Sequence, residues 1–171
     1  RADLHLRFAI LTQQWIDRNF NAEGALGASG PWRKLSPNTI AGRRKGSQKV
    51  LQNTGYLRAS FVSRWNEHEA RVGTPLAIAK YHEFGTKPYS ISPKNKTYLA
   101  FPHAQGTPLK KATYFPSAER KYPKGVPFIF TRGPIKHPGL PMRPMLPTRT
   151  VILPTLLRAT LAYVKESGVI K

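Results

Sequence analysis

The sequence predicts an α+β fold, in which a small antiparallel β-sheet packs with helices and a long, proline-rich basic arm extends from it. Helical spacing of apolar residues near both ends of the chain indicates the helices. Short apolar runs separated by polar turns indicate the strands. Ten of the 16 prolines fall within residues 86–142, which excludes long helices there because each proline removes a backbone donor.

The expected elements alternate along the chain, and each boundary has a local signal. Ser36 precedes Pro37, and this pair is typical of a helix start because serine caps free amides and proline at the first position loses no hydrogen bond. The polar run 66–69 between apolar runs predicts a hairpin. The elements are a helix over 2–20, a loop over 22–31, helices over 37–45, 54–57 and 75–84, a hairpin over 59–73, strands at 98–101 and 128–131, and a helix over 149–167. The sheet is expected to combine 59–73, 98–101 and 127–131.

A chain of 171 residues suits a single domain with its own core. Its expected parts are the N-terminal helix 2–20, a core over 32–85, the basic arm 86–137, and a C-terminal segment and helix over 138–167. No stretch approaches the roughly 18 apolar residues of a membrane span, so we expect no membrane partner. The chain begins at Arg1 within the helical pattern, so we expect the natural polypeptide to start earlier.

The charge is strongly positive, with 28 Lys and Arg residues against 8 acids and a net charge of +20. Such a charge opposes the compact state, so an anionic partner is expected to neutralise it. Nucleic acid is the first candidate, an acidic protein surface the second and a membrane surface a distant third. The candidate interaction residues are Arg43, Arg44, Lys45, Lys94, Lys96, Lys110, Lys111, Arg120, Lys121, Lys124 and Arg143.

Two alternatives remain open for these cations. The run 43–45 could instead complement the dipole at a helix C-terminus. The arm 86–137 holds ten Lys and Arg residues against one Glu, and aromatic residues lie between them. That mixture suits stacking on single-stranded nucleic acid, or docking into a neighbouring subunit. The prolines favour docking, since they order an extended segment in advance.

Catalytic chemistry finds little support in the residues. The chain has no cysteine, which excludes disulfides and thiolate chemistry. His82-Glu83 begins like a zinc-protease helix, but Thr86 stands where the second histidine is needed. The other histidines lack ligand spacing, and the acids are too few for a carboxylate cluster. We therefore expect no metal, no cofactor and no enzymatic activity.

An ordered series of short motifs is more specific. It runs from Asn19-Phe20 through Trp32-x-x-Leu35-Ser36-Pro37 and Val50-Leu51-Gln52-x-Thr54-Gly55-x-Leu57 to Val72-Gly73-Thr74, Tyr81-His82-x-Phe84-Gly85 and Pro141-x-Arg143-Pro144-x-Leu146. This series resembles the virion morphogenesis, or tail completion, family of tailed bacteriophages, especially its Mu-like branch. The resemblance covers residues 15–85 and 138–165. Its structural motif residues are Trp32, Leu35, Leu51, Gly55, Leu57, Gly73, His82, Phe84, Gly85 and Pro144.

The resemblance implies a structural protein of the virion, assembled in the host cytoplasm and located at the neck where tail meets head. It implies a homo-oligomeric ring, often of six subunits, that contacts the tail terminator or tail tube and the head connector and through which the genome passes. Contact with genomic DNA in the channel is an added expectation. The competing hypotheses are a stand-alone basic nucleic-acid-binding module and a nuclease. The missing carboxylate cluster argues against the nuclease.

Overall fold

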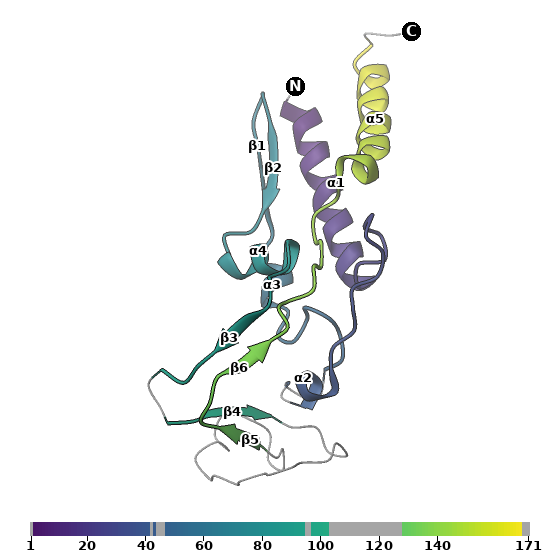
Figure 1. The fold of residues 1–171 in the computed structure, drawn as a ribbon. Helices are drawn as coiled ribbons and strands as arrows, with labels where there is room; N and C mark the ends of the chain where they lie inside the picture. The colour runs from purple at the N-terminus through teal and green to yellow at the C-terminus, as the bar shows by residue number, and fades with distance from the viewer. Residues whose placement is uncertain (1, 42, 44–46, 95–96, 103–127, 169–171) are drawn as a thin grey trace.

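A computed structural model describes residues 2–41, 43, 47–94, 97–102 and 128–168. The elements are α1 (Ala2–Asn21), α2 (Pro37–Ala41), α3 (Tyr56–Ala59), β1 (Val62–Trp65), β2 (Ala70–Gly73), α4 (Ala77–Glu83), β3 (Tyr89–Ile91), β4 (Leu99–Pro102), β5 (Phe128–Thr131), β6 (Ile135–His137) and α5 (Arg149–Glu166). The described part is elongated, with α1, the β1–β2 hairpin and α5 at one end and α2 with β4 and β5 at the other (Figure 1). The α+β class is confirmed.

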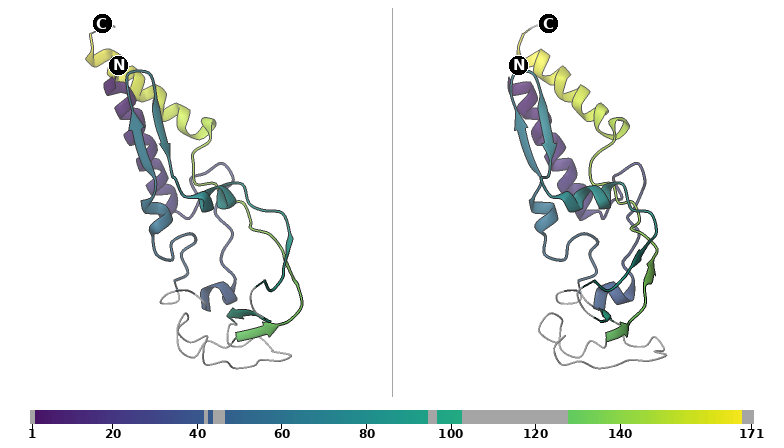
Figure 2. Two further views of the ribbon diagram at one scale, coloured as in Figure 1. Left: turned by 90° about the vertical axis from the view of Figure 1, so that its left-hand side faces the viewer. Right: turned by 60° about the vertical axis from the view of Figure 1, so that its left-hand side comes forward.

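Helix α1 organises the first of these ends. It contacts both strands of the hairpin and also α5, so it lies between the two (Figure 2). The contact with α5 is reinforced near the free ends of both helices, where Arg7 pairs with Glu166 and its guanidinium lies 5.6 Å from the ring centre of Tyr163. The apolar spacing predicted for 2–20 thus produces a helix with two packed faces.

The core forms where the C-terminal half of α1 meets the loops below it. The ring of Phe20 is fully buried and packs edge-on against Trp32, with ring centres 5.3 Å apart, and against Phe61 at 5.9 Å. Partly buried leucines at 35, 51 and 57 pack around this cluster. The buried cluster consists of Trp15, Ile16, Phe20, Trp32, Val50, Phe61, Ala79 and Met145.

The strands form three separate two-stranded antiparallel ladders, β1–β2, β3–β6 and β4–β5. The strands predicted at 98–101 and 128–131 are confirmed, and the structure shows that they pair with each other, with Leu99 opposite Thr131. The expectation that these strands join the hairpin in one sheet is wrong, and β3 and β6 were not predicted. Pro93 and Pro134 lie between the β3–β6 and β4–β5 ladders, and Pro88 and Pro138 flank β3–β6. Because proline cannot donate to a ladder, each ladder stays short.

The helix and turn predictions hold with shifted ends. The Thr39 amide donates to the Ser36 hydroxyl (3.2 Å), as a cap requires, but α2 ends at Ala41 and not at 45. Helix α3 begins at Tyr56, two residues later than predicted. In the hairpin turn, the Asn66 side chain accepts hydrogen bonds from the amides of the two residues that follow Glu67, at 2.8 and 2.9 Å.

Two glycines permit a close crossing of distant backbone segments after α4. Gly85 and Gly139 have φ values of 69° and 86°, a region that side chains rarely adopt. A Cβ atom at Gly139 would lie 2.2 Å from the carbonyl oxygen of Thr86, and one at Gly85 would lie 2.8 Å from that of Leu140. We call this crossing of residues 82–87 with 137–145 the clasp.

The substitution Gly139→Ala is expected to lower the free energy of unfolding by about 2 kcal/mol or more, because it adds left-handed strain to a steric clash. Gly133→Ala is the matched control, since nothing lies within 4 Å of its added Cβ atom. Urea denaturation followed by circular dichroism measures both. Equal losses in the two variants would show that the clasp does not depend on Gly139.

Candidate interaction site

The clasp places an extended segment alongside the C-terminal end of α4. The Arg143 amide donates to the His82 carbonyl at 2.7 Å, and the Thr86 amide donates to the Leu140 carbonyl at 3.0 Å. The side chain of Glu83 accepts a hydrogen bond from the Met145 amide at 2.7 Å. These bonds fix the position of residues 139–145, because an extended segment outside a sheet needs partners for its backbone groups.

Pro144, which lies between Arg143 and Met145, anchors this segment to α1 and to the loop that follows α1. The Pro144 carbonyl accepts hydrogen bonds from Trp32 Nε1 at 3.0 Å and from Asn19 Nδ2 at 3.3 Å. Both donors are buried. Since buried donors left unbonded would be costly, this carbonyl couples the C-terminal segment to the core.

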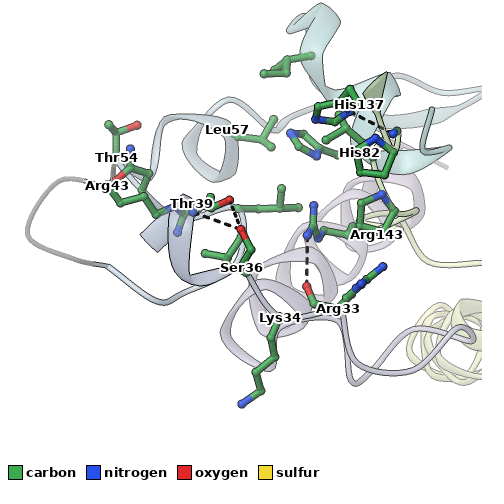
Figure 3. A pocket seen from close by; sticks show the side chains of 18 of the residues that line it. Arg33, Lys34, Ser36, Thr39, Arg43, Thr54, Leu57, His82, His137 and Arg143 are labelled. Atoms are coloured by element: carbon green, nitrogen blue, oxygen red, sulfur yellow. Dashed lines mark hydrogen bonds between the residues drawn. The ribbon is translucent and has the colours of Figure 1, made fainter. Parts of the chain in front are cut away.

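A hollow of about 870 Å³ lies between the clasp, α2 and the loop before α3 (Figure 3). Its walls combine aliphatic and cationic side chains. The lining residues are Arg33, Lys34, Leu35, Ser36, Thr39, Arg43, Leu51, Asn53, Thr54, Tyr56, Leu57, Leu76, Ile78, His82, His137, Pro138, Gly139, Leu140, Pro141 and Arg143. No Asp or Glu is among them. We call this feature the basic hollow.

Arg143 is a buried cation in the wall of the basic hollow. Its side chain is only 7% exposed, and its guanidinium donates to the Arg33 carbonyl at 3.2 Å (Figure 3). Burial lowers the pKa of Arg143, and the charges of Arg43 and Arg33 lower it further. Burial also lowers the pKa of Arg43, against the opposing charge of Glu23. Arg43 and Arg33 therefore repel Arg143, and no described residue of the lining is an anion.

Two neighbouring titratable groups of α4 are shifted by burial in opposite directions. Burial, and then the positive charge of Arg143, lower the pKa of His82. Burial raises the pKa of the Glu83 carboxyl, while hydrogen bonds from the Met145 and Leu146 amides lower it. Both shifts favour the neutral form of the group in the folded protein.

The predicted interaction residues are distributed unevenly. Arg43 and Arg143 line the basic hollow, although Arg143 is buried within the fold and not on an outer surface. Lys94 is exposed between β3 and β4. The remaining ones, Arg44, Lys45, Lys96, Lys110, Lys111, Arg120, Lys121 and Lys124, lie outside the described residues.

The structural motif residues mostly take internal positions. Trp32 is buried, Leu35, Leu51 and Leu57 pack on the core, and Pro144 and His82 belong to the clasp with Gly85. Gly55 precedes α3 in a left-handed conformation, and Gly73 closes β2. Phe84 is the exception, because its ring is 77% exposed.

Arg33, Lys34 and His137 also line the basic hollow and were not predicted. Arg33 and Lys34 occupy the two x positions of the Trp32-x-x-Leu35 motif. Their positive charge is the feature of the sequence that could have identified them as site residues. His137 had no such signal, because only the clasp brings it near.

Within the part of the chain that the structure describes, no group of three or more His, Asp or Glu residues could hold a metal ion. In the same part, no helix has the length and apolar character that crossing a membrane requires.

Comparison with protein families identifies the chain's relatives. The sequence model of the phage virion morphogenesis family matches residues 11–128, more than half of the chain. The chain belongs to the phage virion morphogenesis family. Its role therefore lies in phage virion assembly, as a structural or morphogenesis protein. No curated protein and no solved structure gives a significant match.

The matched range includes most of the residues that line the basic hollow but ends before residues 137–145, the second segment of the clasp. Trp32, Arg43 and His82 fall inside the family match, whereas Arg143 and Pro144 follow it. The predicted resemblance over 15–85 is thus confirmed, and the match also extends into the basic arm. The contacts of Pro144 with Trp32 and Asn19 tie the unmatched C-terminal segment to the family region.

Acidification is expected to destabilise the fold through His82. Because its folded pKa lies below the ordinary 6.5, its contribution to stability is complete above pH 6.5 and is lost as pH falls through the folded value. Glu83 acts with the opposite sign, so the difference between the protein and its His82→Gln variant isolates the histidine. Thermal unfolding between pH 7.5 and about 5 measures that difference.

The exposed His68→Gln variant serves as the control and should follow the unmodified protein at every pH. A destabilisation by His82→Gln that is constant across the pH range would contradict the assignment.

Proposed function

We propose that this chain is a ring-forming tail completion protein at the head–tail junction, where it joins the tail to the head. It acts as a structural part of the virion and carries out no catalysis. Its partners are further copies of itself, the tail terminator or tail tube and the head connector. Membership of the phage virion morphogenesis family supports an assembly role, and the unusual exposure of apolar side chains supports an oligomer.

The observation that carries the proposal is a leucine stripe on α5. Leu153, Leu157 and Leu161 recur every four residues on one helix face, and the last two are 53% and 59% exposed. The helix is held to α1 by its other contacts, so the stripe faces away from the chain's own core. Burying one such side chain against a neighbour stabilises by roughly 1.5–3 kcal/mol.

A second apolar strip lies on α4 and on Phe84, the residue that follows this helix. Ile78, Tyr81 and Phe84 are spaced three apart, and all three are exposed. Monomeric proteins rarely leave contiguous apolar patches in water, so helix faces of this kind are typical of subunit interfaces. Two different surfaces on one chain permit a head-to-tail contact, which closes into a ring when the rotation allows.

The alternative function is a stand-alone nucleic-acid-binding module, which the net charge of +20 favours. On that hypothesis an isolated monomer binds DNA tightly, and charge alone provides the affinity. On our proposal DNA is one partner within an assembled channel.

Replacing the stripe with Leu157→Glu and Leu161→Glu is expected to abolish the oligomer, because each change places a charge in the buried contact. Mass photometry and negative-stain microscopy of the purified protein measure assembly. Circular dichroism reports whether the subunit stays folded.

The matched control is Arg158→Gln with Ala162→Glu. It alters net charge by the same amount on the same helix, about 100° away from the stripe. An oligomer that survives the leucine changes, or one lost equally in the control, would refute the α5 interface.

DNA binding distinguishes the two functions. A stand-alone module predicts a monomer whose DNA affinity falls steeply with salt, with a log–log slope of several units. A protein that stays monomeric, never joins purified tails and yet binds DNA in this way would overturn the proposal. Rings that attach to tail ends would exclude the module.

A further inference from the structure

We propose that the basic hollow is a docking site for a short, acidic and leucine-rich segment of a partner protein of the virion. This inference deepens the proposed function, because it names the chemistry by which the subunit recognises a partner.

The charges require an anionic occupant. Arg33, Lys34, Arg43 and Arg143 line the hollow together with two histidines, and none of the described lining residues is a carboxylate. The ion pairs of the described residues, Arg7–Glu166, Arg58–Asp17 and Arg71–Glu69, all lie elsewhere. Arg43 and Arg33 repel Arg143, and Glu23 offsets only the charge of Arg43, so a bound carboxylate relieves a cost that the free subunit carries.

The hollow also contains buried polar atoms with unsatisfied hydrogen bonds. Arg143 Nε and His82 Nδ1 are enclosed and have no hydrogen-bond partner among the described residues. Nearly all buried polar groups in proteins are bonded, so each exception calls for an explanation. An acceptor brought by a partner, with a small rearrangement of the Arg143 side chain, would satisfy one of them.

The walls select a peptide over a nucleic acid. Leu35, Leu51, Leu57, Leu76, Ile78 and Leu140 are aliphatic. Single-stranded nucleic acids are held instead on aromatic stacking platforms, and Tyr56 is the only Phe, Tyr or Trp among the lining residues that the structure describes. Aliphatic walls beside cations match a segment that alternates leucine-like and acidic side chains.

The size of the hollow agrees with such a segment. A volume of about 870 Å³ falls in the range of about 300–1,000 Å³ that accommodates ligands of short-peptide size, and a duplex cannot enter it. The chain itself supplies poor occupants. Residues 103–127 carry five Lys and Arg residues against one Glu, and the whole chain has only 8 acids, so a second copy is a weaker complement.

The probe is a fluorescein-labelled peptide of alternating leucine and glutamate, about five residues long so that its volume stays below that of the hollow. Its control alternates leucine and glutamine. Fluorescence anisotropy with the full chain is expected to show binding of the acidic peptide and at least about tenfold weaker binding of the neutral one.

Charge reversal at the rim tests the site. The double substitution Arg33→Glu and Lys34→Glu changes two exposed side chains. The backbone carbonyl of Arg33, which accepts a hydrogen bond from Arg143, is retained. This variant should weaken peptide binding at least about tenfold. Arg158→Glu with Lys165→Glu on α5 changes net charge equally and should leave binding within about twofold. Equal losses would show attraction to charge anywhere on the chain and would overturn the proposal.

Ile78→Gln tests the wall, since Ile78 is 52% exposed and its replacement spares the core. Weaker peptide binding is expected, while Ile10→Gln on α1 should have no effect. If Ile78→Gln changes nothing and a short single-stranded DNA displaces the peptide fully, the hollow binds polyanions by charge and the proposal fails.

The docking site and the proposed ring can be refuted independently of each other. Rings that form and attach to tails without any peptide binding would refute the docking site alone. Peptide binding by a chain that never assembles would refute the ring and leave the site. Loss of self-assembly in the Arg33 and Lys34 variant, with peptide binding unchanged, would identify a second copy as the occupant and would overturn the partner proposed.

Discussion

The carbonyl of Pro144 is the point on which the described architecture depends. It accepts hydrogen bonds from Trp32 and Asn19, two buried donors on different segments. The bond to Asn19 reaches α1, and the bond to Trp32 reaches the aromatic core around Phe20. Other hydrogen bonds hold the C-terminal segment beside α4, but this junction connects the segment to the aromatic core. The constraint is local, but it connects parts of the chain more than 100 residues apart.

The clasp next to this junction determines the shape of the basic hollow. Gly85 and Gly139 let two backbones approach more closely than side chains allow. The crossing places Arg143 beside Arg33 and leaves its charge uncompensated in a half-apolar hollow. A fold selected for stability alone would replace such a cation with an apolar group, because an unpaired buried charge is costly. Its presence agrees with a protein that meets its counter-charge on a partner, as an assembly component does.

The described core is small for the number of apolar residues in the chain. One buried cluster around α1 holds the hairpin, α4 and the clasp, while the leucines of α5 and the apolar side chains of α4 face water. In the proposed ring these surfaces form the contacts between copies, since such interfaces resemble a core divided between chains. The elongated arrangement of the ladders beyond the clasp provides further surface at the opposite end (Figure 1).

The sequence alone determined the α+β class, most of the elements, the Ser36 cap, the hairpin turn and the existence of strands at 98–101 and 128–131. It also determined the family, because these signals are local or follow a fixed order of short motifs. Only the tertiary structure decided that the ladders stay separate and that Arg33 and Arg143, 110 residues apart, share one hollow. Proline placement limits each ladder, but the meeting of distant cations depends on the path of the clasp. Spacing along a chain does not encode such a path, because contacts between distant residues depend on how the segments between them fold.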